Sequence, residues 1–394
     1  MDFASKMEFD KTEKKNRLFE TMLVISCFMT NISQLPYFVS SGRTQLLNTP
    51  VWIVTFFFLM IIGKYRLSIK LSGIFALSIM AACFMALLSI FTEYDYFHSS
   101  VISCLLISLF ILLIGEQAGR LISEECIRRI NLSYVVSTLI VSLFIYVQYF
   151  SNGYNLSSRL YAYSSKNSIS QIIFTAIVIL LFTNITNSKF LKICRIVVIA
   201  FEVFLLMILR SRATIVGFFL CLFVIVVGKE FNRKLKYLLM TVLCIVALLT
   251  LFSQSFFGVL FNNILFAGRK ASDLNNLTSG RVHILSSFPD RINGHWLTGI
   301  GSIYYECFPL SCILQFGLIA GIMIIIVSYS PLYFCVRLNR KEPDSSAFVL
   351  VCVGYIINSL FEGLAPIGPG VKCYYLWLMF GILISKGRFK SRTQ

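Results

Sequence analysis

The strongest constraint in this chain is a succession of long apolar segments separated by short polar ones. A helix needs about 20 apolar residues to cross the hydrocarbon core of a bilayer. Twelve segments reach or approach that length, which predicts an all-α polytopic membrane protein of about twelve transmembrane helices. They cover approximately residues 18–40, 48–63, 71–91, 99–115, 132–150, 168–186, 193–209, 213–228, 236–257, 308–335, 346–363 and 371–385.

The composition agrees with a membrane environment. Hydrophobic residues make up 57% of the chain and charged residues 13%, with a mean hydropathy of +0.80, whereas a soluble domain is typically about 25% charged. We therefore expect one transmembrane domain over residues 18–385, with polar tails over 1–17 and 386–394. Pro36 lies near the outer end of the first segment and predicts that the helix kinks or ends there.

Lysine and arginine set the expected orientation, because loops rich in these residues stay in the cytoplasm. With both termini in the cytoplasm, only ten of the 35 positively charged residues face outward. The longest outward segment covers about residues 258–307, between the ninth and tenth expected helices. It carries Trp296 and two nearby glycines, Gly299 and Gly301, rather than a polar low-complexity tract. We therefore expect it to be an ordered loop.

The remaining features argue against several function classes. The net charge of +17 is scattered in short groups, without the contiguous basic face of a nucleic-acid-binding protein. Most of the 12 cysteines lie inside apolar segments and no CxxC pair occurs, so neither a disulfide framework nor a zinc site is indicated. The histidines His98, His283 and His295 all fall outward but form no metal-binding motif. We expect no metal and no soluble cofactor.

The outward cations oppose the usual charge bias, and ionisable groups at this depth are candidates for function. Arg210 and Arg212 end one apolar segment and begin the next. Their guanidinium groups must therefore lie at or just below the outer interface. The alternative for both is passive snorkelling to lipid phosphates or water. The full set is Arg43, Arg159, Lys166, Arg210, Arg212, Arg269, Lys270, Arg281, Arg291 and Lys372.

Several arginines with few acidic partners at an outer membrane surface indicate an anion site, because the planar guanidinium donates paired hydrogen bonds to phosphate. A lipid pyrophosphate is the anion expected at that depth, and arginines would stabilise the charge that develops on it as a leaving group. The reaction also needs a base for an acceptor hydroxyl. No Asp-x-Asp pair that would hold a metal–nucleotide complex is present, which favours a lipid-linked donor. The outward candidates for the base are Glu306, Glu362, His283 and His295.

Four stretches of the sequence resemble the bacterial O-antigen polymerase and O-antigen ligase superfamily, often called Wzy and WaaL. Together they cover roughly the second half of the chain and the stretch 159–168. The first is Arg159 with a short spacer before Lys166-Asn167, and the second is Ser211-Arg212-Ala213 at a tight outer hairpin. The third joins Ser279-Gly280-Arg281 to Gly299-Ile300-Gly301 in the large loop. The fourth runs from Glu306 to Gly321 in the following helix.

The resemblance implies an inverting, metal-independent glycosyl transfer in the bacterial inner membrane, between repeat units linked to undecaprenyl pyrophosphate. Arg212 and Arg281 would hold the pyrophosphate, and Glu306 would act as the base or orient the acceptor. The implied partners are lipid-linked oligosaccharides, membrane lipids and a separate chain-length regulator. The implied substrate-binding residues are Arg159, Lys166, Asn167, Arg210, His283, His295 and Glu362.

One departure separates the polymerases from the ligases. Ligases carry a His-Asn pair at the start of the helix after the loop, whereas this chain has Glu306-Cys307. That pair resembles the capsule and O-antigen polymerases more closely. A ligase stays open as an alternative, as does a flippase for lipid-linked oligosaccharides. Against a transporter, the two halves show no convincing repeat and Glu202 is the main charge expected near the bilayer midplane.

Overall fold

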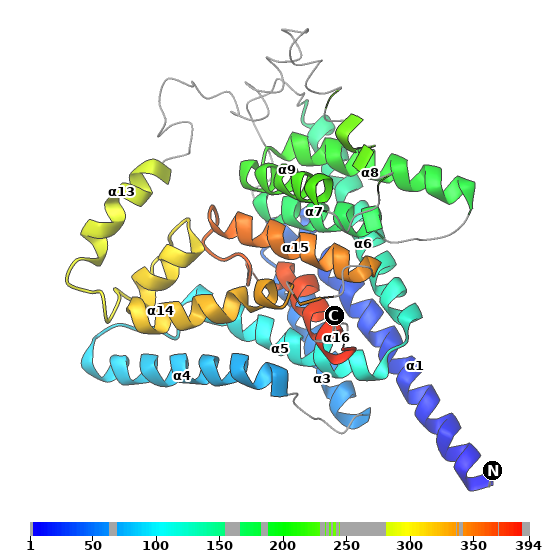
Figure 1. Ribbon diagram of the computed structural model, residues 1–394, viewed down its shortest axis with the longest axis horizontal. Coiled ribbons are helices and arrows are strands. Elements are labelled where there is room, and N and C mark those ends of the chain that lie inside the picture. Colours follow the sequence, from blue (N-terminus) through cyan, green and yellow to red (C-terminus); the bar gives the residue numbers. More distant parts are fainter. Residues whose placement is uncertain are drawn as a thin grey trace.

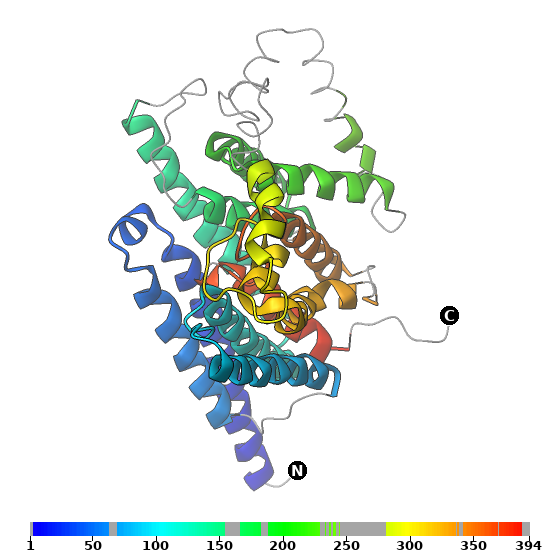
Figure 2. The ribbon, with the colours of Figure 1, turned by 90° about the vertical axis from the view of Figure 1, so that its left-hand side faces the viewer.

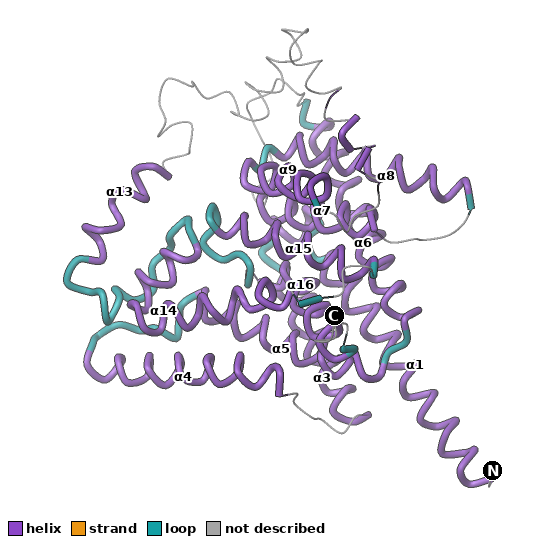
Figure 3. The backbone as a smooth tube through the Cα atoms, in the orientation of Figure 1, coloured by secondary structure: helices purple, strands orange, loops and turns teal. Residues whose placement is uncertain are grey.

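The structure is a computed structural model of the chain, and every regular element in its described part is helical (Figure 1, Figure 3). This confirms the expected all-α class for that part. The described residues are 3–62, 69–153, 166–182, 188–228, 233, 236–237, 239–241, 244, 281–335, 337–338, 342–368 and 370–387.

The helices alternate with short connections along most of the described chain. The first half contains α1 (Phe3–Ile32), α2 (Pro36–Ser40), α3 (Thr44–Ile62), α4 (Ile69–Phe91), α5 (Ser100–Leu121), α6 (Glu124–Ser151) and α7 (Lys166–Phe182). The second half contains α8 (Lys189–Leu209), α9 (Arg212–Val227), α13 (Arg281–Ile292), α14 (Phe308–Cys335), α15 (Pro343–Ser359), the 3-10 helix η2 (Gly370–Cys373) and α16 (Tyr374–Ser385).

Four of the described helices are long and apolar enough to cross a membrane, which supports the membrane class. They are Leu71–Phe91 within α4, together with α5, α6 and α14. Described helices also overlap every expected apolar segment except 236–257, of which only scattered residues are described. The count of twelve crossings and the loop topology remain predictions. Pro36 has the expected effect, since α1 ends at Ile32 and Pro36 opens the short α2.

The centre of the bundle is built on close backbone contact between α5 and α16. Gly115 and Gly119 of α5 lie against the backbone of α16, and Gly381 of α16 lies against α5. A Cβ added at Gly381 would meet the backbone nitrogen of Glu116 at 2.5 Å. Small residues of this kind let helices approach closely in a lipid environment. Trp377 of α16 is fully buried, and its indole N–H donates to the carbonyl of Pro366 (3.1 Å).

The tenth expected span is not one straight helix, because α14 breaks at Gly317. Gly317 has φ 73° and ψ 178°, a conformation that favours glycine. The segment before α14 fills the break: the backbone N–H of Ile300 donates to the carbonyl of Leu314 (2.8 Å), and that of Leu318 donates to the carbonyl of Trp296 (2.8 Å). The break therefore fixes the segment 293–307 onto α14.

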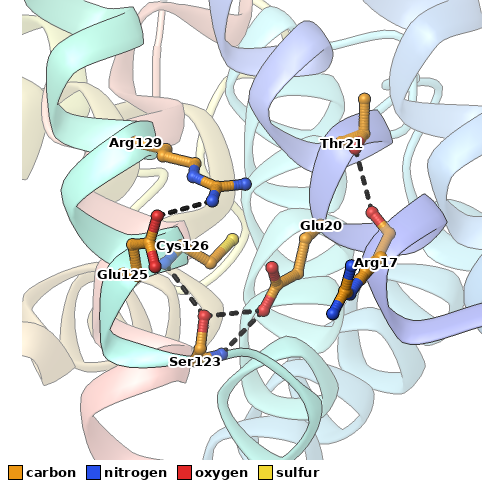
Figure 4. Close-up of polar contacts among 7 residues, drawn as sticks. All are labelled: Arg17, Glu20, Thr21, Ser123, Glu125, Cys126 and Arg129. Carbon is orange, nitrogen blue, oxygen red and sulfur yellow. Dashed lines mark hydrogen bonds and ion pairs between the residues drawn. The ribbon is translucent and has the colours of Figure 1, made fainter. Parts of the chain in front are cut away.

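Different segments lie at the two ends of the helical bundle. α13 and the 293–307 segment project on one side, at the left of Figure 1, and α13 lies in front of α14 when that side faces the viewer in Figure 2. The other end contains the turn between α5 and α6. There the carboxylate of Glu20 accepts from the backbone N–H (2.8 Å) and the hydroxyl (2.9 Å) of Ser123, as Figure 4 shows. The ammonium of Lys386 lies 3.0 Å from the Glu124 carboxylate.

Candidate functional site

A pocket of about 270 Å³ opens where the starts of α9 and α13 meet the segments before α14 and after α15. Its polar lining comes from Arg212, Arg281 and Glu306. Its walls are mainly apolar and include Val216 of α9 and Leu285 of α13. The structure thus brings together the three residues to which the sequence assigned the chemistry, from parts of the chain far apart in sequence.

A tight hairpin between α8 and α9 positions Arg212. Arg210 ends α8 with φ 52°, the only positive φ at a non-glycine residue in the described part of the chain. Ser211 then turns back into an extended conformation, and Arg212 is the first residue of α9. A left-handed arginine is unusual, and the turn it makes delivers the next arginine to the pocket. Arg210 itself is buried (7% exposed) and is not among the residues that line the pocket.

Arg281 makes three contacts with the pocket wall. Its guanidinium donates a 3.0 Å hydrogen bond to the backbone carbonyl of Phe361 and lies 5.6 Å from the centre of the Phe361 ring. Its Nε lies 3.6 Å from Oε2 of Glu306, too far for a good hydrogen bond. Glu306 is 37% exposed, so this ion pair contributes about 0–1 kcal/mol to stability.

Glu306 is placed by the packing of two loops. A Cβ at Gly363 would collide with the carbonyl of Tyr305, so the chain after α15 can lie directly on the segment that carries Glu306. Glu306 also precedes the first turn of α14, which begins at Phe308. The amino-terminal end of a helix favours negative charge. A carboxylate, or a ligand anion in its place, is therefore stabilised at this position.

A second polar cluster lies beside the pocket, around Glu362. The amide of Asn167, at the start of α7, donates a 2.6 Å hydrogen bond to Glu362. The Glu362 carboxyl also interacts electrostatically with the cationic side chains of Arg281, Lys372 and Lys166. Glu362 is not among the pocket-lining residues, although its neighbour Phe361 is.

The other expected site residues lie elsewhere or outside the described residues. His283 is exposed on α13 and does not line the pocket. His295 is half-buried, with its ring 6.3 Å from that of Tyr94. Arg159 lies outside the described residues. Glu202 of α8, the charge expected near the bilayer midplane, accepts a 2.7 Å hydrogen bond from Ser142.

Two features of the site were not predicted from the sequence. Phe361 contributes a ring and a carbonyl to Arg281, but a phenylalanine after an apolar helix looks like any other. The apolar walls come from exposed side chains, with Val216 at 41%, Val282 at 45% and Leu285 at 52%. Their one-sided clustering beside two arginines is visible only when α9 and α13 are placed together.

The arrangement suits an amphipathic anion. Two guanidinium groups can share the oxygens of a phosphate or diphosphate, while the exposed valine and leucine side chains cover an apolar chain. No group of three or more histidine, cysteine, aspartate or glutamate side chains suited to a metal ion occurs within the described residues. No family model matches the chain, and no curated protein matches it either.

Proposed function

We propose that the protein is a membrane glycosyltransferase that polymerises oligosaccharide repeat units of a bacterial surface glycan, an O-antigen or a capsular polysaccharide. The observation that carries the proposal is the pocket at the starts of α9 and α13, where Arg212 and Arg281 adjoin apolar walls. The proposed donor is a glycan linked to undecaprenyl pyrophosphate. The proposed acceptor is a second lipid-linked repeat unit.

The apolar walls favour a lipid-linked donor over a soluble one. A polyprenyl chain offers apolar surface that can pack against Val216, Val282 and Leu285, whereas a nucleotide sugar has no apolar chain to place there. The same walls fit poorly with a small soluble anion, which needs only the arginines.

The proposed reaction assigns a role to each polar group. The acceptor hydroxyl attacks the anomeric carbon of the donor's reducing-end sugar, the bond from that carbon to the pyrophosphate oxygen breaks, and undecaprenyl pyrophosphate leaves. Arg212 and Arg281 stabilise the charge on the leaving group. Glu306 is the proposed base that takes the hydroxyl proton. Glu362, which accepts a hydrogen bond from Asn167, is the alternative base.

The proposed reaction takes place at the outer face of the membrane. The pocket faces the outer side of the bacterial inner membrane, and both termini lie in the cytoplasm. This orientation rests on the excess of lysine and arginine in the loops expected inside. The lipid-linked substrates would reach the pocket from the outer leaflet, and a chain-length regulator would be a separate partner.

Reconstitution into liposomes with purified lipid-linked repeat units tests this function. We expect a ladder of longer chains without added metal or nucleotide sugar. Movement of repeat units across the bilayer without a ladder would contradict the proposal in favour of a flippase. Transfer to a lipid A–core acceptor without a ladder would contradict it in favour of a ligase.

A further inference from the structure

The contacts of Arg281 leave part of its hydrogen-bonding capacity unused. One terminal nitrogen donates to the Phe361 carbonyl at 3.0 Å. The Nε atom is buried and has no hydrogen-bond partner among the described residues, although Oε2 of Glu306 lies 3.6 Å away. A buried donor without an acceptor is costly. The pocket therefore holds a guanidinium that a closer oxygen would satisfy better than Glu306 does.

Glu306 occupies the position where that oxygen would come from. It is the only acidic residue among the described residues that line the pocket. The Glu306 side chain is 37% exposed, whereas that of Arg281 is 19% exposed. The carboxylate can therefore turn toward the pocket opening, while the guanidinium is fixed by its carbonyl and ring contacts with Phe361.

The geometry points to Glu306 as an internal counter-ion, which holds the place of the donor phosphate beside Arg281 until the donor binds and displaces it. The identity of the donor in this inference rests on the proposed function, but the displacement requires only a diphosphate. A diphosphate carries more charge than a carboxylate and offers several oxygens, so it can satisfy the unused Nε donor. An ion pair at a partly exposed site opposes that exchange only weakly.

Displacement would set an order of events at the site. While Glu306 is paired with Arg281, its carboxylate is held against the guanidinium. After the donor diphosphate takes that place, the carboxylate is free to face the acceptor hydroxyl. Donor binding would therefore precede productive acceptor binding. An enzyme of this kind would not remove a proton from the acceptor before the donor is in place.

The test measures binding of farnesyl diphosphate and of inorganic pyrophosphate to the full-length protein in lipid nanodiscs by titration calorimetry. We expect Glu306→Gln to tighten the binding of both probes by about fivefold, since it removes a competing negative charge at this separation. Glu306→Asp, with a shorter side chain, should tighten binding less. Glu93→Gln removes the same charge from an exposed position on the loop between α4 and α5 and should leave affinity within about twofold, as expected for a screened surface charge.

The outcomes distinguish a failure of the counter-ion proposal from a failure of the proposed function. Unchanged or weaker binding to Glu306→Gln, with the wild type binding normally, would overturn the counter-ion and leave the glycosyltransferase standing. Tighter binding of both probes to Glu306→Gln, with farnesyl diphosphate binding no better than pyrophosphate, would support the counter-ion and contradict a lipid-linked donor. If the wild type binds neither probe, both proposals fail.

Discussion

The two ends of the helical bundle use charged residues in different ways. At the end with the α5–α6 turn, Glu20 accepts two hydrogen bonds from Ser123, and Lys386 reaches both Glu124 and the carbonyl of Ile122 (Figure 4 shows the Glu20 contacts). At the pocket end, Nε of Arg281 has no hydrogen-bond partner in the described part of the chain, and the nearest Glu306 oxygen lies 3.6 Å away.

The difference separates charges that join helices from charges that line a pocket. The Glu20 and Lys386 contacts connect α1 and α16 to the start of α6, and they use short hydrogen bonds. The pocket places two arginines beside one acid, and its supporting backbone contains a left-handed Arg210 and a broken helix at Gly317. Unusual backbone geometry of this kind is common at functional sites. The comparison predicts that changes at the pocket end affect activity and changes at the other end affect stability alone.

The largest expected effect is that of Arg212→Ala on chain extension. Loss of one group that stabilises a developing negative charge typically lowers the rate by about 10²–10³. We expect a loss of that size in the liposome assay, with normal amounts of protein in the membrane. Arg291→Ala is the matched control, because Arg291 is exposed on α13 and does not line the pocket. Equal activity of the two variants would show that Arg212 is a passive surface cation.

The next effect is on folding at the pocket end, through Gly317→Ala. A Cβ at Gly317 would collide with the carbonyl of Leu297 and would also force a non-glycine residue to φ 73°. Strain and overpacking together should cost about 3–4 kcal/mol of unfolding free energy. Gly294→Ala is the control for backbone strain alone. Gly294 also has a positive φ, 78°, but a Cβ added there would meet no described atom within 4 Å. Thermal unfolding in detergent should lower the midpoint far more for Gly317→Ala, and equal shifts would refute a structural role for the close contact.

The smallest effect is expected at the other end, for Glu20→Ala. It removes the acceptor for two hydrogen bonds from Ser123, which should cost about 1 kcal/mol of stability. Chain extension per folded molecule should not change, because Glu20 touches no pocket residue. Glu125→Ala serves as the comparison, since Glu125 pairs with Arg129 only within α6 and its loss should be barely measurable. A defect in chain extension at normal stability would break the distinction between the two ends.

The helices could be predicted from the sequence because apolar length and charge placement act locally. The break in α14 could not, since Gly317 lies in an apolar run that is typical of a continuous helix. Its cause is the backbone of residues 296–301, which approaches from another part of the chain. The sequence feature that could have indicated the break is the set of glycines at 299, 301 and 317, all of which adopt positive φ in the structure.

The candidate site was predictable only residue by residue. Arg212 and Arg281 stood out because cations are unexpected outside, and Glu306 because it adjoins a re-entering apolar segment. Their meeting in one pocket depends on packing between α9, α13 and α14, which no spacing in the chain encodes. Tertiary contacts decide the rest: His295 lies against Tyr94 and Asn167 binds Glu362. From the sequence, all of these residues were expected on the outer side of the membrane. Nothing in it distinguished the residues that line the pocket from those that do not.

The most direct test of the account is an electron cryo-microscopy structure of the protein in nanodiscs with undecaprenyl pyrophosphate. We predict density for the diphosphate between the guanidinium groups of Arg212 and Arg281, with Glu306 turned away from Arg281 and the prenyl chain along Val216 and Leu285. Diphosphate density at another site, or a pocket that opens to the cytoplasmic side, would contradict the account.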